Sequence, residues 1–359
     1  MEIILITFST LYFFIWIITF LGILKHYKKT NNIDKMSVSI VISARNEEEN
    51  ISKTLSSLKK LDLEKLDWEI ILVNDASEDN TLKIMKNFKN NYLNTKIINI
   101  REKNKDLKGK KYAITRAVRK AKGEYIFFTD ADCTVGRKWI KTGLKYFTPE
   151  TGLIMGHIKY RDGLFINLES IIGSIFTFSW AFINNSPYCS GGNIAVKKSK
   201  FIKSGGYSDL PNIASGDDTF LLQKIKKISS IKPVFDKNYF VKTDYIEEKE
   251  SVKDKNKRKY AKNFLMEPFN IVLFFFGILY HILLIYNLLF NFGANILIIL
   301  LFKFFLEYLI FIIGAARMKE TRYILYYPIF IVYYPFKIIY YSFLGFIKGY
   351  RWKSEKNIH

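Results

Sequence analysis

YIFFTDADCTV, residues 125–135, places two aspartates directly after an apolar run. The run itself has the aromatic and β-branched side chains of a buried strand. Asp130 and Asp132 are separated by one residue, so in an extended segment their side chains leave the same face. Together they can approach one cation, and Mg²⁺ or Mn²⁺ readily takes carboxylate oxygens. Acids at strand ends also commonly just solvate a turn, so the rest of the chain has to decide between the two interpretations.

Strand-like and helix-like segments alternate around this stretch. Strands are predicted at 38–44, 68–75, 96–100 and 124–130, and helical spacing occupies 45–61, 78–90 and 110–123, with Ser77 as an N-cap of the second helix. This alternation predicts an α/β fold in which helices cover both faces of a mostly parallel, twisted sheet. Ligands of such sheets bind beyond the carboxyl ends of the strands, where Asp75 and the two aspartates fall. The sequence lacks both common phosphate-cradling glycine motifs, so a phosphate ligand there would need a metal.

Apolar segments at both ends of the chain predict a membrane protein. Residues 3–24 form an uncharged apolar run, long enough to cross a hydrocarbon core of about 30 Å as a helix. The run lacks the basic start and cleavage site of a signal peptide, so it is predicted to be retained. The basic cluster KHYKK (25–29) then places the following residues on the cytoplasmic side of the membrane.

The domain boundaries follow from this hydropathy. Three further apolar segments are found at 269–290, 294–314 and 323–347. The predicted organisation is an anchor at 1–30, a soluble cytoplasmic domain at 36–262, a membrane region of two to three spans at 266–348, and a basic tail at 349–359. The segment 164–183 is too polar for a clear span, and either lies in the membrane interface or forms a buried core helix.

The amino-acid composition limits the kinds of partner and cofactor that we expect for this protein. The chain of 359 residues carries 55 Lys+Arg against 33 Asp+Glu, a net charge of +22. Its lysines are spread among Ile and Asn and form no nucleic-acid-binding motif, so attraction to anionic membrane lipid is the preferred explanation. The two cysteines, Cys133 and Cys189, lack zinc-ligand or redox spacing and are predicted to be reduced thiols.

Four stretches together resemble the membrane-anchored bacterial type of the family 2 glycosyltransferases of GT-A fold, over residues 36–262. They are VSIVISARNEEENI (38–51), ILVNDASEDNT (71–81), KGKKYAITRAVRKAKGEYIFFTDAD (108–132), and the glycine-rich segment with its acidic pair (189–225). Two positions depart from the family pattern, since Ser43 stands where proline is usual and Asn74 where an aspartate is usual.

The resemblance implies a donor site. Its nucleotide-binding residues would be Ala44, Glu47, Asp75, Lys110 and Asp130, with Asp75 on the uracil or ribose and Lys110 on the phosphates. The metal, Mg²⁺ or Mn²⁺, would be held by Asp130 and Asp132. The alternative for Asp75 and Ser77 is that they only cap the next helix.

The resemblance also implies an acceptor side. Asp218 would be the catalytic base, and Gly192, Asp217, Lys259 and Tyr260 would bind the acceptor. The last two belong to NKRKY (256–260), a degraded form of the family's Gln-x-x-Arg-Trp box, which weakens the case for polymer synthesis. Alternatively, the two acids only stabilise the N-terminal end of a helix through its dipole, and the glycines only permit backbone conformations that other residues disfavour.

The function implied is an inverting, metal-dependent transfer of one sugar from a nucleotide-diphosphate donor, UDP-linked, to a hydroxyl of a lipid or glycan acceptor. One rival is transfer to a polyprenyl phosphate, whose anionic oxygen needs no general base. Another is a membrane scaffold or transporter with an inactive domain, for which Lys303 and Glu307 inside a predicted span are the main argument. These two residues are four apart on one helical face, so they are instead predicted to pair with each other.

Overall fold

The computed structural model describes residues 2–92, 94–101, 107, 110–208, 216–244, 256, 267–348, 350–352 and 355–357. The chain forms two compact units. The sheet unit comprises residues 26–170 and 181–246, and the helical unit comprises residues 1–25, 171–180 and 247–359.

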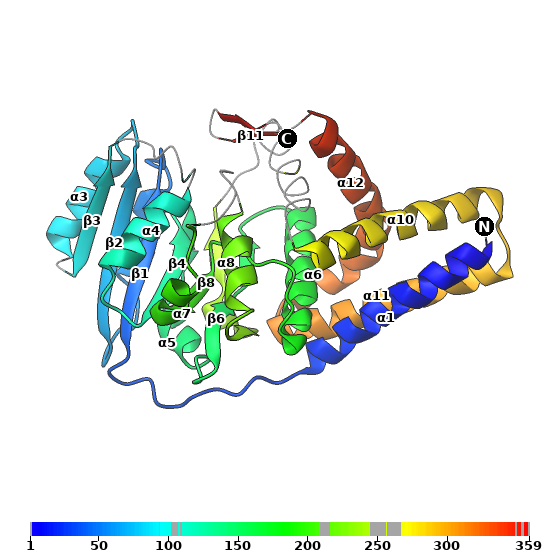
Figure 1. The fold of residues 1–359 in the computed structure, drawn as a ribbon, viewed down its shortest axis with the longest axis horizontal. Coiled ribbons are helices and arrows are strands. Elements are labelled where there is room, and N and C mark those ends of the chain that lie inside the picture. Colours follow the sequence, from blue (N-terminus) through cyan, green and yellow to red (C-terminus); the bar gives the residue numbers. More distant parts are fainter. Residues whose placement is uncertain are drawn as a thin grey trace. The chain divides into compact units, whose positions relative to one another are not determined.

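The sheet unit is built on a seven-stranded sheet of order β3-β2-β1-β4-β8-β6-β9 (Figure 1). Its parallel half consists of β1 (Ser37–Ala44), β2 (Asp67–Asp75), β3 (Thr95–Ile100) and β4 (Tyr125–Asp130). These are the four strands that the sequence predicts, and β1 pairs in parallel with both β2 and β4. Because β1 is central and its segment reads VSIVISA, it is buried on both faces, as parallel strands are.

The other half of the sheet was not predicted. It contains β6 (Thr151–Met155), β8 (Ile194–Lys197) and β9 (Ser230–Pro233). Strand β8 pairs antiparallel with both β4 and β6, whereas β6 and β9 run parallel. The sheet is therefore mostly parallel on one side of β4 and mixed on the other.

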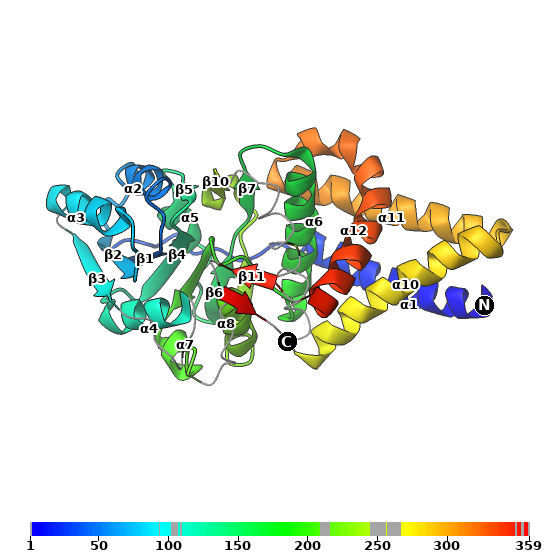
Figure 2. The ribbon, with the colours of Figure 1, turned by 90° about the horizontal axis from the view of Figure 1, so that it is seen from above.

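Helices cover both faces of this sheet, which confirms the predicted α/β class. Helices α2 (Ile51–Leu58) and α5 (Trp139–Leu144) lie on one face, and α4 (Lys110–Lys120) and α8 (Asp217–Ile225) on the other (Figure 2). The unit also contains α3 (Thr81–Asn91), α7 (Lys198–Lys203), the short 3₁₀ turns η1 (Ala181–Ile183) and η2 (Lys237–Tyr239), and residues 164–170 of α6 (Leu164–Trp180).

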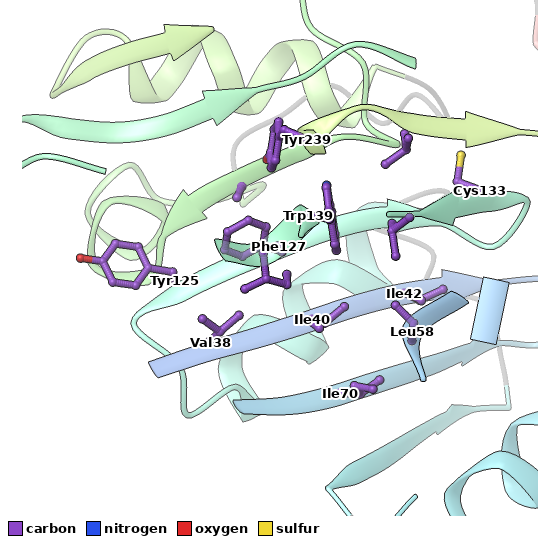
Figure 3. Close-up of a cluster of buried hydrophobic side chains, with 14 of the residues drawn as sticks. Val38, Ile40, Ile42, Leu58, Ile70, Tyr125, Phe127, Cys133, Trp139 and Tyr239 are labelled. Atoms are coloured by element: carbon purple, nitrogen blue, oxygen red, sulfur yellow. The ribbon is translucent and has the colours of Figure 1, made fainter. Parts of the chain in front are cut away.

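The main core lies between the sheet and the two helices α2 and α5 that cover one of its faces (Figure 3). Ile40, Ile42 and Ile70 are fully buried there. The rings of Phe127 and Trp139 meet edge to face with centroids 5.4 Å apart, an arrangement favoured by aromatic quadrupoles. This packing fixes β1 and β4, whose last residues reach the edge where the candidate site lies.

A second, three-stranded sheet extends that edge. It has the order β5-β10-β7, with β5 (Cys133–Val135), β10 (Val241–Thr243) and β7 (Ile158–Tyr160). Strand β5 begins immediately after the two aspartates, and its Cys133 lies opposite Thr243 in antiparallel register. The sheet therefore holds the chain directly after the acidic motif.

The helical unit contains α1 (Glu2–Leu24), α10 (Pro268–Phe290), α11 (Ala294–Met318), the 3₁₀ helix η4 (Thr321–Tyr326), α12 (Tyr327–Lys348), and residues 171–180 of α6 (Leu164–Trp180). Among the described residues, four segments are long and apolar enough to cross a membrane: α1, residues 164–183, α10 and α11. Helix α12 occupies most of the apolar segment 323–347; it contains Pro335 and is not among these four candidate spans of the described residues. Two further short strands, β11 (Tyr350–Trp352) and β12 (Glu355–Asn357), lie near the end of the chain.

The ionisable residues inside α11 pair with each other, as their spacing predicts. Lys303 Nζ lies 2.7 Å from Glu307 Oε1, and both side chains are almost fully buried. Tyr12 on α1 donates its hydroxyl to the same Glu307 oxygen at 2.5 Å. Because each charge already has a partner, these residues give no support to a transport path.

Candidate active site

Three predicted nucleotide-site residues lie at the carboxyl edge of the parallel strands. Ala44 ends β1, Asp75 ends β2 and Asp130 ends β4. The registers place Ala44 beside Asn74, and Ser43 beside Asp130. The parallel topology therefore gathers side chains that are far apart in the sequence at one edge of the sheet.

The loops after β1 and β2 are bonded to each other at this edge. Asn46 donates its backbone N–H to Ser77 Oγ at 3.2 Å, and Asn46 Oδ1 accepts from the backbone N–H of Glu78 at 2.9 Å. The backbone N–H of Glu47 donates to Thr81 Oγ1 at 2.8 Å. The two loops thus form one rim around Asp75, held by contacts between them.

The alternative that Asp75 and Ser77 cap the next helix is wrong. Helix α3 begins at Thr81, six residues after Asp75, and the Thr81 N–H donates to Asp79 Oδ1 at 3.0 Å. The predicted N-cap, Ser77, instead bonds the loop after β1, as described above. The N-cap residue is Asn80, which makes no side-chain cap bond, and Asp79 before it accepts from the first N–H group of the helix.

The acidic motif brings three potential metal-ligand atoms together. One donor atom from each of Asp130, Asp132 and Cys133 lies within 4.8 Å of the other two. Burial, followed by the charges of Asp130 and Glu47, raises the pKa of Asp132 to about 6. Crowded carboxylates of this kind fit a divalent cation, because its charge would offset their mutual repulsion.

Helix α2 fixes the backbone of this motif. Thr54 donates its hydroxyl to the carbonyl of Ala131, the residue between the two aspartates, at 2.6 Å. Ser57 Oγ accepts from the Val135 N–H at 3.2 Å. Thr243 adds a longer contact, with Oγ1 3.4 Å from Asp132 Oδ2. Sequence reasoning missed all three polar residues, since each acts through partners distant in the chain.

Lys110, the first residue of α4, links the acidic motif to the acidic pair of α8. Its ammonium forms an ion pair with Asp130 Oδ1. Burial alone would lower the pKa of Lys110, but the charges of Asp130 and of the Asp217–Asp218 pair hold it above its usual value. The lysine is therefore charged at neutral pH, and acids from two separate motifs surround it.

Asp217 and Asp218 are the first two residues of α8, and their carboxylates have different surroundings. Asp218 Oδ2 accepts from the Gly191 N–H at 2.8 Å, and Oδ1 accepts from the Thr219 N–H at 2.7 Å. Burial raises the pKa of Asp217 to about 6, because the opposing effect of Lys110 is smaller. The first turn of α8 does carry both acids, as expected from the helix dipole, but the side chain of Asp218 also reaches a turn 27 residues earlier.

The Gly191–Gly192 turn lies between the two acidic motifs. A Cβ at Gly192 would lie 2.8 Å from Asp130 Oδ2 and 2.8 Å from Ile158 Cδ1. A Cβ at Gly191 would lie 3.3 Å from Asp218 Cβ. A side chain at Gly192 would therefore push against the ends of the Asp130 and Ile158 side chains, whereas Gly191 contributes mainly its N–H group. The predicted residues Lys259 and Tyr260 lie outside the described residues.

Comparisons with known proteins identify the relatives of the sheet unit. Residues 39–206 match the model described as glycosyl transferase family 2. A poly-beta-1,6-N-acetyl-D-glucosamine synthase of Staphylococcus epidermidis is 33% identical over 148 residues, which are 41% of this chain and 33% of that protein. A poly(ribitol-phosphate) beta-glucosyltransferase of Bacillus spizizenii is 40% identical over 101 residues, 28% of this chain and 16% of that protein. This chain thus spans a third or less of the length of these curated relatives.

A solved structure matches almost the whole chain. The mannosyltransferase PcManGT of Pyrobaculum calidifontis, in complex with GDP-Man and Mn²⁺, superposes with a TM-score of 0.60. The match covers 97% of this chain and 98% of that one at 15% identity. At this identity the similarity concerns the fold, and it confirms the GT-A arrangement implied by the sequence.

Proposed function

We propose that this chain is a member of glycosyl transferase family 2, whose model matches residues 39–206, and that it transfers a sugar from a nucleotide-diphosphate donor to a hydroxyl of a lipid or glycan acceptor. One observation carries the proposal: the Gly191–Gly192 turn bonds Asp218 through the Gly191 N–H and lies against Asp130, which is paired with Lys110. That arrangement joins a site for an anionic diphosphate to a site for proton removal. The relatives named for poly-N-acetylglucosamine synthesis and poly(ribitol-phosphate) glucosylation support a glycan acceptor. The UDP-linked donor is the one that the resemblance of the motifs implies.

The donor would bind along the carboxyl edge of the parallel strands. The rim around Asp75, with Ala44 and Glu47, would take the nucleoside, because a carboxylate there can accept from ribose hydroxyls or the base. Lys110 would exchange part of its contact with Asp130 for the diphosphate oxygens. The neighbouring carboxylates keep the Lys110 ammonium charged, so it can form an ion pair with an anionic ligand at neutral pH.

Asp130 and Asp132 would hold the divalent ion, Mg²⁺ or Mn²⁺. When bound, the ion supplies charge neutralisation to the leaving diphosphate. The Mn²⁺ in the similarly folded mannosyltransferase supports this choice of ion class. Thr54, through its bond to the Ala131 carbonyl, keeps the two carboxylates in position.

Asp218 would act as the general base. Its carboxylate would take the proton of the acceptor hydroxyl while that oxygen forms a bond to the anomeric carbon and the bond from that carbon to the diphosphate oxygen breaks. A single displacement inverts the anomeric centre. The N–H groups of Gly191 and Thr219 orient the carboxylate before the acceptor arrives. Asp217 and Gly192 would line the acceptor side, together with Lys259 and Tyr260.

The acceptor is proposed to be presented at a membrane. Four segments of the described chain are apolar and long enough to span one. The basic cluster at 25–29 would keep the catalytic domain, 36–262, on the cytoplasmic side of the inner membrane, between the anchor (1–30) and the C-terminal membrane region (266–348). A polyprenyl phosphate acceptor is the rival, but it would leave the oriented Asp218 carboxylate without a role.

The test is sugar transfer by membranes that contain the full chain, with a panel of labelled nucleotide sugars. The wild type should transfer label to an extractable lipid or glycan in a reaction that stops when divalent ions are chelated. Asp130→Ala and Asp132→Ala should abolish transfer and weaken metal-dependent UDP binding, because each removes a carboxylate ligand.

Asp34→Ala is the matched control. Asp34 is an exposed acid that precedes the first residue of β1, whereas the candidate site lies at the last residue of that strand. This variant should behave like the wild type. Full activity of the Asp132 variant would contradict the metal assignment, and label found only on a polyprenyl phosphate would favour the rival acceptor.

A further inference from the structure

Cys133 lies in the acidic motif and has no role in the proposed transfer. Its Sγ is one of the three donor atoms that lie within 4.8 Å of one another, the other two being carboxylate oxygens of Asp130 and Asp132. The Sγ also lies 3.4 Å from Asp132 Oδ1. The thiol is buried, so it belongs to the interior of the site and not to the outer surface.

A second observation places the thiol and Asp130 on the same side of the motif. A Cβ added at Gly192 would lie 2.8 Å from Asp130 Oδ2 and 3.4 Å from Cys133 Sγ. Both atoms therefore border the space that the missing side chain of Gly192 leaves free. The other oxygen of Asp130 is occupied by Lys110, so Oδ2 is the one directed toward the thiol side.

The backbone around Cys133 is firmly held. Residue 133 begins β5 and lies opposite Thr243 of β10. The Ala131 carbonyl is anchored by Thr54, and the Val135 N–H by Ser57. A ligand in this segment would be positioned in advance, as effective metal sites require.

The distances suit an ion that accepts sulfur. Zinc binds sulfur at about 2.3 Å and oxygen at about 2.0–2.2 Å with tetrahedral geometry, so two donors of one ion lie about 3.6 Å apart. Cys133 Sγ lies 3.4 Å from Asp132 Oδ1, and the donor atoms of all three residues lie within 4.8 Å of one another. Carboxylates suit Mg²⁺ and Mn²⁺, whereas a soft thiolate selects zinc and similar thiophilic ions.

We propose that Cys133 is a third protein donor at this metal site, and that it enables the site to bind thiophilic divalent ions, namely Zn²⁺, Co²⁺ and Cd²⁺, through sulfur. This inference rests on the proposed function, because the site is the one assigned to the ion of the transfer reaction. A hard ion uses the two carboxylates. A thiophilic ion adds the sulfur, displaces the thiol proton to solvent and competes with the hard ion, so it inhibits transfer.

The test is direct metal binding to the purified full chain in detergent, with Co²⁺ as a spectroscopic probe. The chain has two cysteines, Cys133 and Cys189. A sulfur-to-cobalt charge-transfer band in the near ultraviolet should appear in the wild type and persist in Cys189→Ser. Since Cys133 is the only thiol left in that variant, the band assigns the ligand even if a Cys133 variant folds poorly.

Cd²⁺ displacement of Mn²⁺, followed by the paramagnetic resonance of Mn²⁺, gives the affinities. Cys133→Ser should lose the cobalt band and bind Cd²⁺ about tenfold or more weakly, while its Mn²⁺ affinity stays within about threefold of the wild type. Cd²⁺ should correspondingly inhibit Mn²⁺-supported transfer less in this variant.

The outcomes separate the inference from the function. Mn²⁺ binding with normal transfer, but no cobalt–sulfur band in Cys189→Ser, would overturn the role of Cys133 and leave the transfer site intact. Unchanged Cd²⁺ affinity in Cys133→Ser would overturn it as well. If the wild type bound no divalent ion, and Asp132→Ala transferred sugar normally, both assignments would fall.

Discussion

Asp217 and Asp218 are adjacent and share the start of α8, yet only Asp218 receives the Gly191 N–H. Asp218→Asn should therefore leave UDP-sugar binding in place and lower the transfer rate by about two to four orders of magnitude, the usual scale for loss of a general base. Transfer kinetics and an equilibrium binding assay on the same preparation would separate the two effects.

Asp217→Asn is the comparison, since it removes the same charge from the same turn. Its loss of transfer should be much smaller than that of Asp218→Asn. Equal losses would mean that the pair acts only as a source of negative charge. If Asp218 acted only at the helix end, the variant would cost about 1 kcal/mol of stability and retain most transfer.

The pKa of Asp217 predicts a pH dependence of stability. Its folded-state pKa is raised to about 6, above that of an unfolded aspartate, so the native protein binds this proton more tightly than the unfolded chain does. The free energy of unfolding should then fall as pH rises between about 4 and about 6. Chemical denaturation across this window should show a shallower fall in Asp217→Asn, and identical slopes would contradict the prediction.

At the scale of elements, the Gly191–Gly192 turn packs against β4 and the start of α8. Gly192→Ala introduces a methyl group 2.8 Å from both Asp130 Oδ2 and Ile158 Cδ1, so the ends of both side chains must shift. We expect Mn²⁺ affinity to fall by about tenfold or more, because the displaced carboxylate is a predicted ligand. Isothermal titration would measure this fall.

Gly277→Ala is a suitable control for this substitution, because a Cβ at Gly277 in α10 meets nothing within 4 Å. Its Mn²⁺ affinity should equal that of the wild type. Normal Mn²⁺ binding by Gly192→Ala would show that Asp130 adjusts without loss, and would weaken its assignment as a fixed ligand.

The elements differ in how far the sequence predicts them. Strands β1 to β4 follow from long β-branched and aromatic runs that end at polar turns, and the structure confirms all four. Strands β8 and β9 have only four residues each, and β9 ends in a proline, so neither shows a usable period. Their positions depend on pairing with strands far along the chain, which a local pattern does not encode.

The candidate site was also predicted only in part from the sequence. The resemblance implied one site for the motifs around Asp130 and Asp218, and the structure connects them through the Gly191–Gly192 turn. Thr54 bonds a backbone carbonyl 77 residues away, and such a contact leaves no trace in residue spacing. The helix cap was misassigned for a similar reason, because Ser77 is bonded to a residue 31 positions earlier.

At the scale of the whole molecule, the position of the C-terminus is predicted from charge. The tail KGYRWKSEK (348–356) is basic, and the positive-inside tendency places it in the cytoplasm. Helix α12 contains Pro335 and is not among the four candidate spans of the described residues, which is compatible with an element that does not cross. A tag on the tail should be digested by protease only in inverted vesicles. Digestion from outside intact cells would refute this topology.

The hydrogen bond between Tyr12 and Glu307 can form only after α11 has been synthesised, so it forms late during translation. The two residues are 295 positions apart, and translation adds roughly 5–20 residues per second. Between roughly 15 and 60 s therefore pass between synthesis of the tyrosine and of its acceptor. During that interval the whole sheet unit emerges from the ribosome, while the first helix still lacks the partner for its hydroxyl. Completion of the helical unit is thus a late step of biogenesis, and a chain truncated before α11 would leave the Tyr12 hydroxyl without that acceptor.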